Sequence, residues 1–443
     1  MNAALSAESG LAYAASFAES LAKRGNAWLA TAQRAAFAAF MEQGWPTRKH
    51  EDWRFTDMTP VQDRLRPAAA VAGTSGLVFD EQLRELGRGR GHRLVFLDGH
   101  RVPGEVAGEP TPAGLVTWSL SRALADARGP AAAMLGTQVA KPSTFVALNT
   151  AFLNDGAFIQ VPGGLRIESP IFLIYLAAAD GGASHPRTLI RAEAGSQATV
   201  VEIHLGADGR ATLANAVTEI VVESGARLAY HAIQRPSSTG FHIGHLAVTQ
   251  HAGSTFQGYG LALAGRLVRN DVHVVLAEEG CTCQLDGLYL AGAGSHLDNQ
   301  TSIDHRAPRC QSRESYRGVV ADRGLAVWSG RAVVRPGAQG TDARQTNRNL
   351  LLAEGAIVHA KPHLEIFASD VKCSHGATAG RLDREALFYL RSRGIGEREA
   401  QQLLISAFLR DGLARVADPA LRGELEAILA GRAHELLGEE ATP

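Results

Sequence analysis

Turn glycines recur along the middle of this chain at a nearly fixed interval. Gly195, Gly225, Gly253 and Gly280 are separated by 30, 28 and 27 residues (225 − 195, 253 − 225, 280 − 253), and Gly337 lies 57 residues beyond Gly280, about two further steps. Each glycine separates short runs rich in Val, Ile, Thr and Tyr, which are typical of β-strands. A repeat of this length predicts a solenoid, in which each coil buries its inward side chains against the neighbouring coils. We therefore expect a parallel β-helix.

Helical patterns precede the repeats. Trp28, Ala32, Ala35 and Ala39 fall on one helix face, and Gly44 ends the pattern as a C-terminal stop. The next stretch, WPTRKHEDWRFTDM, is dense in charged and aromatic residues and has no clear period. It is interpreted as a connector whose two tryptophans pack on a neighbouring element.

Short helices are also expected after Gly380. Asp383 is a predicted N-cap, and Gly394 stands just past the end of the same helix. Asp418 and Pro419 open another helix as its cap and first residue. The predicted class is therefore mainly β, a parallel β-helix core flanked by N-terminal and C-terminal α-helical regions. The predicted divisions are an N-terminal helical region and connector at 1–60, a mixed α/β lead-in at 61–140, the β-helix core at 141–380 and a C-terminal helical region at 381–443.

Charge and cysteine content narrow the function classes. The chain has 44 Lys and Arg residues against 45 Asp and Glu residues, so it offers no electrostatic basis for binding nucleic acid or an anionic membrane. Four cysteines in 443 residues do not make a disulfide framework, which fits a reducing cytoplasm. Glu8 and Glu19 interrupt the apolar N-terminus, so neither a signal peptide nor a membrane span is predicted. The chain also lacks a GxxxxGKS or GxxxxGKT loop, so any ATP hydrolysis is expected in a partner.

Cys373 and His375 are the candidate metal ligands, in the stretch SDVKCSHGATAG. On a strand, residues two apart point to the same face about 6.5 to 7 Å from each other, so both side chains can address one metal or cluster. Two ligands do not close a structural site, and His359 and His363 lie near in sequence without the spacing to complete it. A thiol nucleophile is a weaker interpretation, because the imidazole would point parallel to the thiol rather than at it.

Other candidate residues carry weaker signals. Cys281 and Cys283 have the same spacing on a strand and are interpreted as small packing residues. In a carbohydrate-active β-helix enzyme, Asp322 or Asp342 would serve as acid or base, with Arg323 or Arg344 beside it. Aromatic residues make up only 6% of the chain, which is low for a sugar-binding groove. The stretch TDARQTNRNLLL is instead expected to form polar ladders between coils.

Three stretches together resemble the SufB/SufD family of iron–sulfur cluster assembly proteins. They are HEDWRFTDM, TDARQTNRNLLL and DVKCSHGATAGRLDREALFYLRSRGI, which occur in the family's order and extend the resemblance over nearly the whole chain. The sequence KCSHGAT, the modest length and the lack of an N-terminal cysteine motif resemble the SufD branch rather than SufB. The resemblance implies a right-handed β-helix between helical ends, which agrees with the glycine period.

The resemblance also implies a function. A SufD-like chain would be a non-catalytic scaffold subunit that pairs with a SufB-like paralogue through its β-helix edges. It would recruit a SufC-like ABC ATPase through Asp383–Leu409, and the complex would build a transient iron–sulfur cluster, with reduced flavin as a further component. His375 would be a cluster ligand at the SufB interface, with Cys373 beside it, so that each chain holds part of the site. A self-standing homodimeric scaffold stays as an alternative, because an exposed β edge can pair with its own copy.

Overall fold

A computed structural model of the protein describes residues 7–22, 26–64, 66–67, 77–103, 111–139 and 142–437. The parts of the predicted regions 1–60, 61–140 and 381–443 that fall in the gaps lie outside the described residues. Within the described ranges, no helix combines the length and the apolar character needed to cross a lipid bilayer.

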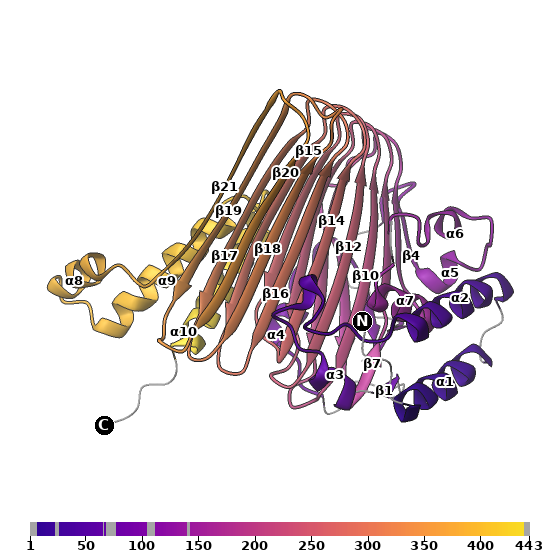
Figure 1. Ribbon diagram of the computed structural model, residues 1–443, viewed down its shortest axis with the longest axis horizontal. Coiled ribbons are helices and arrows are strands. Elements are labelled where there is room, and N and C mark those ends of the chain that lie inside the picture. The colour runs from indigo at the N-terminus through magenta and orange to yellow at the C-terminus, as the bar shows by residue number, and fades with distance from the viewer. Residues whose placement is uncertain are drawn as a thin grey trace.

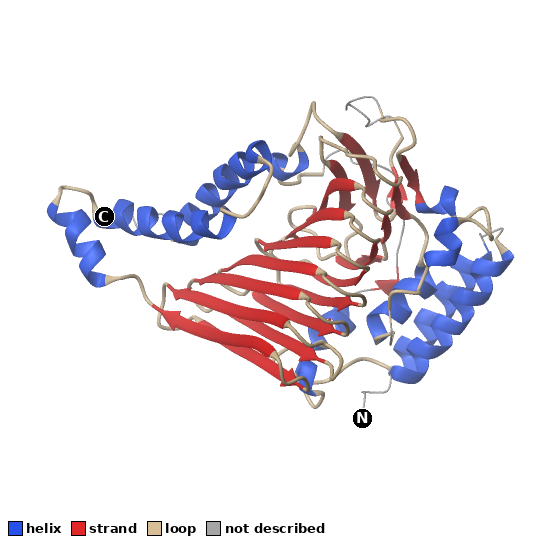
Figure 2. Ribbon diagram, turned by 90° about the horizontal axis from the view of Figure 1, so that it is seen from above, coloured by secondary structure: helices blue, strands red, loops and turns tan. Residues whose placement is uncertain are grey.

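The chain winds into a solenoid of two sheets, and each coil adds one strand to each sheet (Figures 1 and 2). In the first sheet the strands follow the order β20-β18-β16-β14-β12-β10-β8-β5-β4, with β1 and β7 at its side. The second sheet has the order β21-β19-β17-β15-β13-β11-β9-β6-β2-β3. All neighbouring strands from β5 and β6 onward run parallel, so the prediction of a mainly β chain with a parallel solenoid between helical ends is confirmed.

The described helices have the following bounds: α1 Ala7–Ala22, α2 Ala27–Gln43, α3 Thr59–Arg64, α4 Glu81–Arg84, α5 Leu120–Ala123, α6 Pro130–Met134, α7 Thr144–Phe152, α8 Arg384–Ser392, α9 Glu397–Leu413 and α10 Pro419–Leu436, with a short 3-10 helix at Glu51–Trp53. The strands before the long repeats are β1 Arg66–Pro67, β2 His92–Leu97, β3 His100–Arg101, β4 Val116–Ser119, β5 Gly156–Val161, β6 Ile171–Ala177, β7 Gly182–Ser184 and β8 Arg187–Ala192. The remaining strands are β9 Gln197–Gly206, β10 Leu213–Val222, β11 Arg227–Arg235, β12 Phe241–Gln250, β13 Thr255–Ala262, β14 Leu267–Leu276, β15 Thr282–Ala291, β16 His296–His305, β17 Gln311–Val320, β18 Leu325–Val334, β19 Thr341–Leu351, β20 Ile357–Ile366 and β21 Val371–Gly380.

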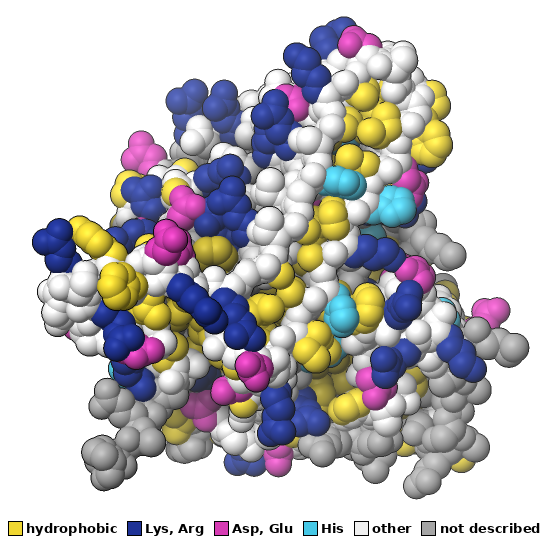
Figure 3. Space-filling model, turned by 60° about the vertical axis from the view of Figure 1, so that its left-hand side comes forward, with side chains coloured by type: hydrophobic (Ala, Val, Ile, Leu, Met, Phe, Trp, Pro, Cys, Tyr) yellow, Lys and Arg dark blue, Asp and Glu magenta, His cyan; other side chains and the backbone are white. Residues whose placement is uncertain are grey.

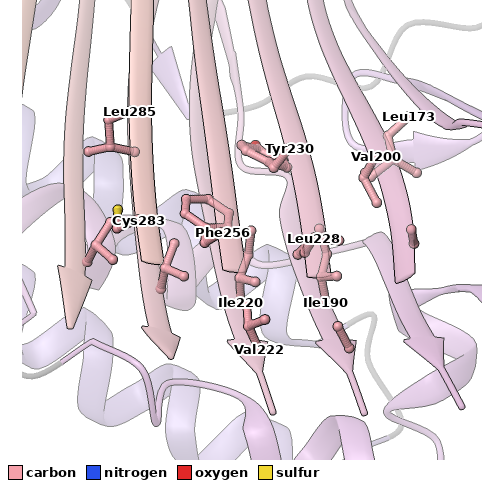
Figure 4. Close-up of a cluster of buried hydrophobic side chains, with 14 of the residues drawn as sticks. Leu173, Ile190, Val200, Ile220, Val222, Leu228, Tyr230, Phe256, Cys283 and Leu285 are labelled. Atoms are coloured by element: carbon pink, nitrogen blue, oxygen red, sulfur yellow. The ribbon is translucent and has the colours of Figure 1, made fainter. Parts of the chain in front are cut away.

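The solenoid core lies between the two sheets. Because neighbouring strands pair in register, every inward residue stacks on the equivalent residue of the next coil, as Leu228 does on Phe256 and Phe256 on Cys283. These side chains meet Ile220 and Val248 of the first sheet in one buried cluster. Figure 4 shows part of this cluster along successive strands. A coil without a neighbour on one side therefore leaves its inward side chains uncovered.

Four of the five turn glycines predicted from the sequence period adopt a left-handed backbone conformation, and the fifth does not. Gly195, Gly225, Gly253 and Gly280 adopt φ values from 64° to 73°, a left-handed region that side chains with a Cβ disfavour. At the late turn this conformation belongs to Gly340 at φ 73°. Gly337, at which the sequence period placed this turn, does not have it, because the two coils from Gly280 to Gly340 span 60 residues rather than 57 (340 − 280, 337 − 280).

The N-terminal region covers the outer face of the first sheet. Helices α1, α2 and α7 pack with Phe241 and Leu267 of β12 and β14 in one apolar cluster. The connector runs over the same face, where Trp45 and Trp53 are buried, so the predicted packing of both tryptophans is confirmed. The guanidinium of Arg269 lies 3.8 Å from the centre of the Trp53 ring.

The C-terminal helices cover the outer face of the second sheet. Residues of α9 and α10 form one apolar cluster with Leu288 of β15 and Val319 of β17. Asp383 and Asp418 accept hydrogen bonds from the first turns of α8 and α10, as predicted. Gly394 follows α8 with φ 86°, which confirms the predicted stop. Helix α8 lies at the outer end of this group, away from the sheets (Figure 1).

Candidate metal-ligand site

The solenoid ends at β20 and β21, and no strand or helix of the described residues caps this end. Strand β20 pairs with β18 and β21 pairs with β19, and no other strand of the described chain pairs with their outer edges. Most residues of β21 are exposed, in contrast to the buried strands behind it. Each edge therefore presents about 30 Å of unpaired backbone donors and acceptors.

Cys373 lies on β21 and faces the space between the two sheets. Its register neighbour on β19 is Ala343, which pairs in turn with Ser312 and, one coil further, with Cys283. Cys283 belongs to the buried core, and the register preserves the side on which each residue points. Burial raises the pKa of the half-buried Cys373 thiol, so it is protonated at neutral pH until a metal displaces the proton.

His375 ends a second inward column. It pairs with Gln345, which pairs with Glu314 and then with Leu285 of the core. Unlike the three residues behind it, His375 is exposed because no further coil covers it. The structure therefore brings Cys373 and His375 to the same side of one strand. They lie at the open end of the core between β20 and β21, which is called the solenoid mouth.

The pair is incomplete as a metal site in this chain. Among the described residues there is no group of three or more His, Cys, Asp or Glu side chains placed to hold a metal ion. A structural site needs about four protein ligands, so two are not enough. The assignment of Cys373 and His375 as cluster ligands stays a prediction at this point.

The two histidines that are near in sequence do not join the pair. They lie on β20 and alternate with the inward Val358, so they point to the outer face of the first sheet. The ring of His359 stacks on Phe55 of the connector, with 4.0 Å between ring centres. His363 Nε2 lies 3.3 Å from Glu365 Oε1.

Polar residues behind the mouth form bonds between coils. Gln345 Nε2 donates a hydrogen bond to Glu314 Oε2 at 2.9 Å, and Asn347 Nδ2 donates to Tyr289 Oη at 2.9 Å. The predicted polar ladders in TDARQTNRNLLL are thus confirmed. The role of Glu314 was missed by sequence reasoning, since a single glutamate on an alternating strand looks like a solvent-facing residue.

Asp322 and Asp342, the candidate acid or base of a carbohydrate-active enzyme, do not form an acid–base pair. Asp342 Oδ2 lies 2.6 Å from Arg313 Nη2, and Asp342 Oδ1 lies 3.3 Å from Arg344 Nε. Partial burial opposes these ion pairs, but together they lower the pKa of Asp342, which makes it a poor proton donor. Asp322 occupies a left-handed turn position with φ 50°.

Two exposed apolar surfaces were also missed. The first, called the end patch, consists of Ile366 and Phe367 at the end of β20, which are 42% and 59% exposed, whereas Ile357, 50% exposed, begins the same strand about 30 Å away. The second, called the α8 patch, consists of Phe388 and Tyr389, which are 74% and 57% exposed. Figure 3 shows hydrophobic and histidine side chains next to one another on one face of the molecule. Large exposed apolar groups of this kind mark interaction sites.

The fold and the site define a class of protein. It is a β-solenoid that presents a thiol and an imidazole on an uncapped end, next to exposed apolar side chains. This end leaves two sheet edges and two side chains of metal-binding types open to a second chain.

Comparisons with known proteins agree with this class. The family model described as SUF system FeS cluster assembly, SufBD core domain, matches residues 175–408. The iron–sulfur cluster assembly protein SufD of Escherichia coli is 30% identical over 397 residues, which cover 88% of this chain and 90% of the relative. An iron–sulfur cluster assembly SufBD family protein of Synechocystis is 30% identical over 395 residues, or 86% of each chain. The chain belongs to the SufBD family, and its role is in iron–sulfur cluster assembly.

Proposed function

We propose that this chain is the SufD-like, non-catalytic subunit of a cytoplasmic complex with a SufB-like paralogue and a SufC-like ABC ATPase. In this complex a nascent iron–sulfur cluster is assembled at the uncapped end of the solenoid. The observation that carries the proposal is the inward position of Cys373 and His375 on the last strand, without further ligands among the described residues.

The edges of β20 and β21 support pairing with a paralogue. A partner that shares the two-sheet core can continue both sheets by adding its own edge strands, which satisfies the free backbone groups. The end patch would then be buried in the interface, where apolar contact adds to the strand pairing. Under this proposal, closing the solenoid mouth also encloses Cys373 and His375.

A site whose ligands are divided between two chains suits a cluster that is later released. Thiolate and imidazole both bind iron, and this chain would supply these two ligands while the paralogue supplies the others. Separation of the two chains would then remove part of the coordination shell and release the cluster as cargo. We propose that reduced flavin held by the assembled complex supplies electrons, which an absorbance spectrum of the purified complex would test.

The proposal predicts that His375→Ala lowers cluster formation without loss of pairing. His375 is exposed, so the substitution leaves the core intact, and loss of a direct ligand is expected to reduce the bound iron and sulfide by at least about tenfold. The matched control is His363→Ala, which removes an exposed histidine from the outer face of the neighbouring strand.

The measurement is made on the complex purified without oxygen after co-expression of the three chains. Cluster content is read from absorbance and from iron and sulfide analysis, and pairing from size-exclusion chromatography. Normal cluster content in His375→Ala would contradict the proposed ligand. Recovery of this chain only as a homodimer, although the paralogue is present, would instead favour the self-standing scaffold.

The α8 patch is the proposed ATPase contact within Asp383–Leu409. Helix α8 has no buried residue, whereas Ile405 and Leu409 of α9 are buried against the second sheet. Deleting the whole segment would therefore strip part of the fold, and a substitution in α8 is the sharper test. ATP-driven movement of the bound ATPase would pull on α8 and open the interface at the solenoid mouth.

Phe388→Ser is expected to abolish capture of the ATPase in a pull-down while the melting temperature stays unchanged, because the Phe388 ring is 74% exposed. Val78→Ser is the matched control, since Val78 is 65% exposed at a different part of the molecule. Full capture by Phe388→Ser would show that the ATPase binds elsewhere.

A further inference from the structure

A second pair of cysteines lies one behind the other at a corner of the solenoid. The residue after each left-handed turn position is buried and small, and in successive coils it is Ser196, Ala226, Ser254, Cys281 and Cys310. The two thiols therefore occupy consecutive steps of one column. The initial interpretation of Cys281 as a simple packing residue accounts for its burial but not for this pairing.

The geometry places the two sulfur atoms in contact. The backbone N–H of Gln311 donates to the carbonyl of Cys281 at 2.8 Å, which locks the two coils in register. The same carbonyl oxygen, that of Glu278, lies 3.1 Å from Cys281 Sγ and 3.3 Å from Cys310 Sγ. They are also within hydrogen-bonding reach of each other. Neighbouring strands are about 4.8 Å apart, which lies within the Cα separation that a disulfide spans.

The two thiols differ in acidity. The hydrogen bond from Cys310 is the largest influence that lowers the pKa of Cys281 to about 7, and the hydroxyl of Ser254 acts in the same direction. The same contact, together with burial, raises the pKa of Cys310. Cys281 is thus the more acidic thiol of the pair and Cys310 the less acidic one, as in dithiols where one sulfur attacks and the other resolves.

The pair lies directly beneath a surface corner. Both thiols are buried, but Glu278, Glu279 and Arg309, which adjoin them in sequence, are exposed. A molecule of the size of water therefore needs only a small opening of the turn to reach the sulfur atoms. Cys283, in contrast, is deep in the core, and burial raises its pKa well above the ordinary value.

We propose that Cys281 and Cys310 form a peroxide-sensitive dithiol that closes into a disulfide between adjacent coils. The Cys281 thiolate attacks one oxygen of hydrogen peroxide, the O–O bond breaks, and the leaving hydroxide takes up a proton to become water. The resulting sulfenic acid is attacked by Cys310, which forms the S–S bond, and the sulfenic oxygen leaves as a second water with the thiol proton. Two thiols lose two electrons, and one peroxide is reduced to two waters.

The disulfide would tie the coil of β15 to the coil of β17 at their shared corner. This site is separate from Cys373 and His375, and the inference does not rest on the proposed partner complex. Its chemical class is a two-cysteine modification site for hydroperoxides.

The test uses the full chain, treated with hydrogen peroxide under conditions that leave its circular dichroism unchanged. The chain is then denatured, its free thiols are alkylated, and the intact mass and tryptic peptides are measured. We expect a mass loss of two hydrogens and a link between peptides 270–306 and 310–313. Because peptide 270–306 also contains Cys283, the experiment is repeated with Cys283→Ala, which should form the same link.

The variant Cys310→Ser separates the two steps of the reaction. It keeps the attacking thiol but lacks the resolving thiol, so we expect a sulfenic acid at Cys281 that dimedone traps, and no disulfide. Free, alkylated Cys281 and Cys310 in the treated folded chain would overturn the proposal. A link that disappears in Cys283→Ala, oxidation confined to Cys373, or unfolding that precedes the link would also overturn it.

Discussion

Glu314 is a buried carboxyl group whose ionisation should weaken the fold. Its side chain lies between the sheets, one coil behind Gln345 and two coils behind His375. Burial raises its pKa to about 7 from the ordinary value of 4.5, although hydrogen bonds from Thr301 and Gln345 act in the opposite direction. The folded chain therefore keeps a proton on Glu314 that the unfolded chain has already lost.

This difference in proton binding sets the sign and the size of the change in unfolding free energy with pH. Between pH 4.5 and about 7 the folded chain binds more protons at Glu314 than the unfolded chain, so the free energy of unfolding falls as pH rises through this window. Below the window Glu314 has no effect, and above it the full cost is present, about 3 kcal/mol. Between pH 5 and pH 8 the expected loss from this one group is about 2.5 kcal/mol.

Glu314→Gln should remove this pH dependence. The amide has the shape of the protonated acid and stays neutral, and the side chain of Gln345 can turn its amide over to keep one hydrogen bond. We expect the free energy of unfolding of the variant, relative to the natural chain, to rise by about 2.5 kcal/mol from pH 5 to pH 8. The assay is denaturant unfolding followed by circular dichroism at several pH values.

Glu354→Gln is the matched control, because the Glu354 side chain is 90% exposed. Its stability should run parallel to that of the natural chain over the same pH range. If Glu314→Gln also ran parallel, the buried carboxyl would be ionised throughout or hydrated in the folded chain, and the reasoning from its burial would be wrong.

Two further pairs of substitutions test the outer face and the turns. Arg269→Met removes the charged partner of the buried Asp298, 2.6 Å away, and should lower the unfolding free energy by about 3 to 5 kcal/mol. Arg309→Met at an exposed ion pair should lower it by about 1 kcal/mol or less. If denaturant unfolding gave the same loss of unfolding free energy for Arg269→Met and Arg309→Met, the prediction for the buried ion pair would be wrong. Gly225→Ala should lower the unfolding free energy by about 1 to 2 kcal/mol because of its φ of 68°, and Gly337→Ala should be nearly neutral; equal melting temperatures for both variants would argue against left-handed strain.

The repeat itself was readable from the sequence for a simple reason. A left-handed turn position selects glycine through a local steric rule, so Gly195, Gly225 and Gly253 mark the coils directly. Helix caps such as Asp383 and Asp418 are equally local, and both were predicted correctly. The turn between Gly280 and Gly340 has Arg309 in the left-handed position, at φ 57°, so no glycine marks it, and counting a fixed period from Gly280 led to Gly337 instead of Gly340.

The outer packing could not be read in this way. The connector crosses the first sheet and stacks Trp53 on Arg269 and Phe55 on His359, contacts between residues more than two hundred positions apart. Nothing in the local pattern of the connector specifies which sheet face it covers. The same limit applies to Glu314, whose inward position depends on the register of β17 between β15 and β19.

The sequence alone determined the solenoid, its helical ends and the pair of Cys373 and His375 on one strand, because periodicity and spacing are properties of neighbouring residues. Only the tertiary structure decided that this pair faces the mouth of the solenoid, that the mouth is uncapped, and that Cys281 and Cys310 are in contact. These features depend on how coils stack, and stacking is set by the packing of side chains from distant parts of the chain.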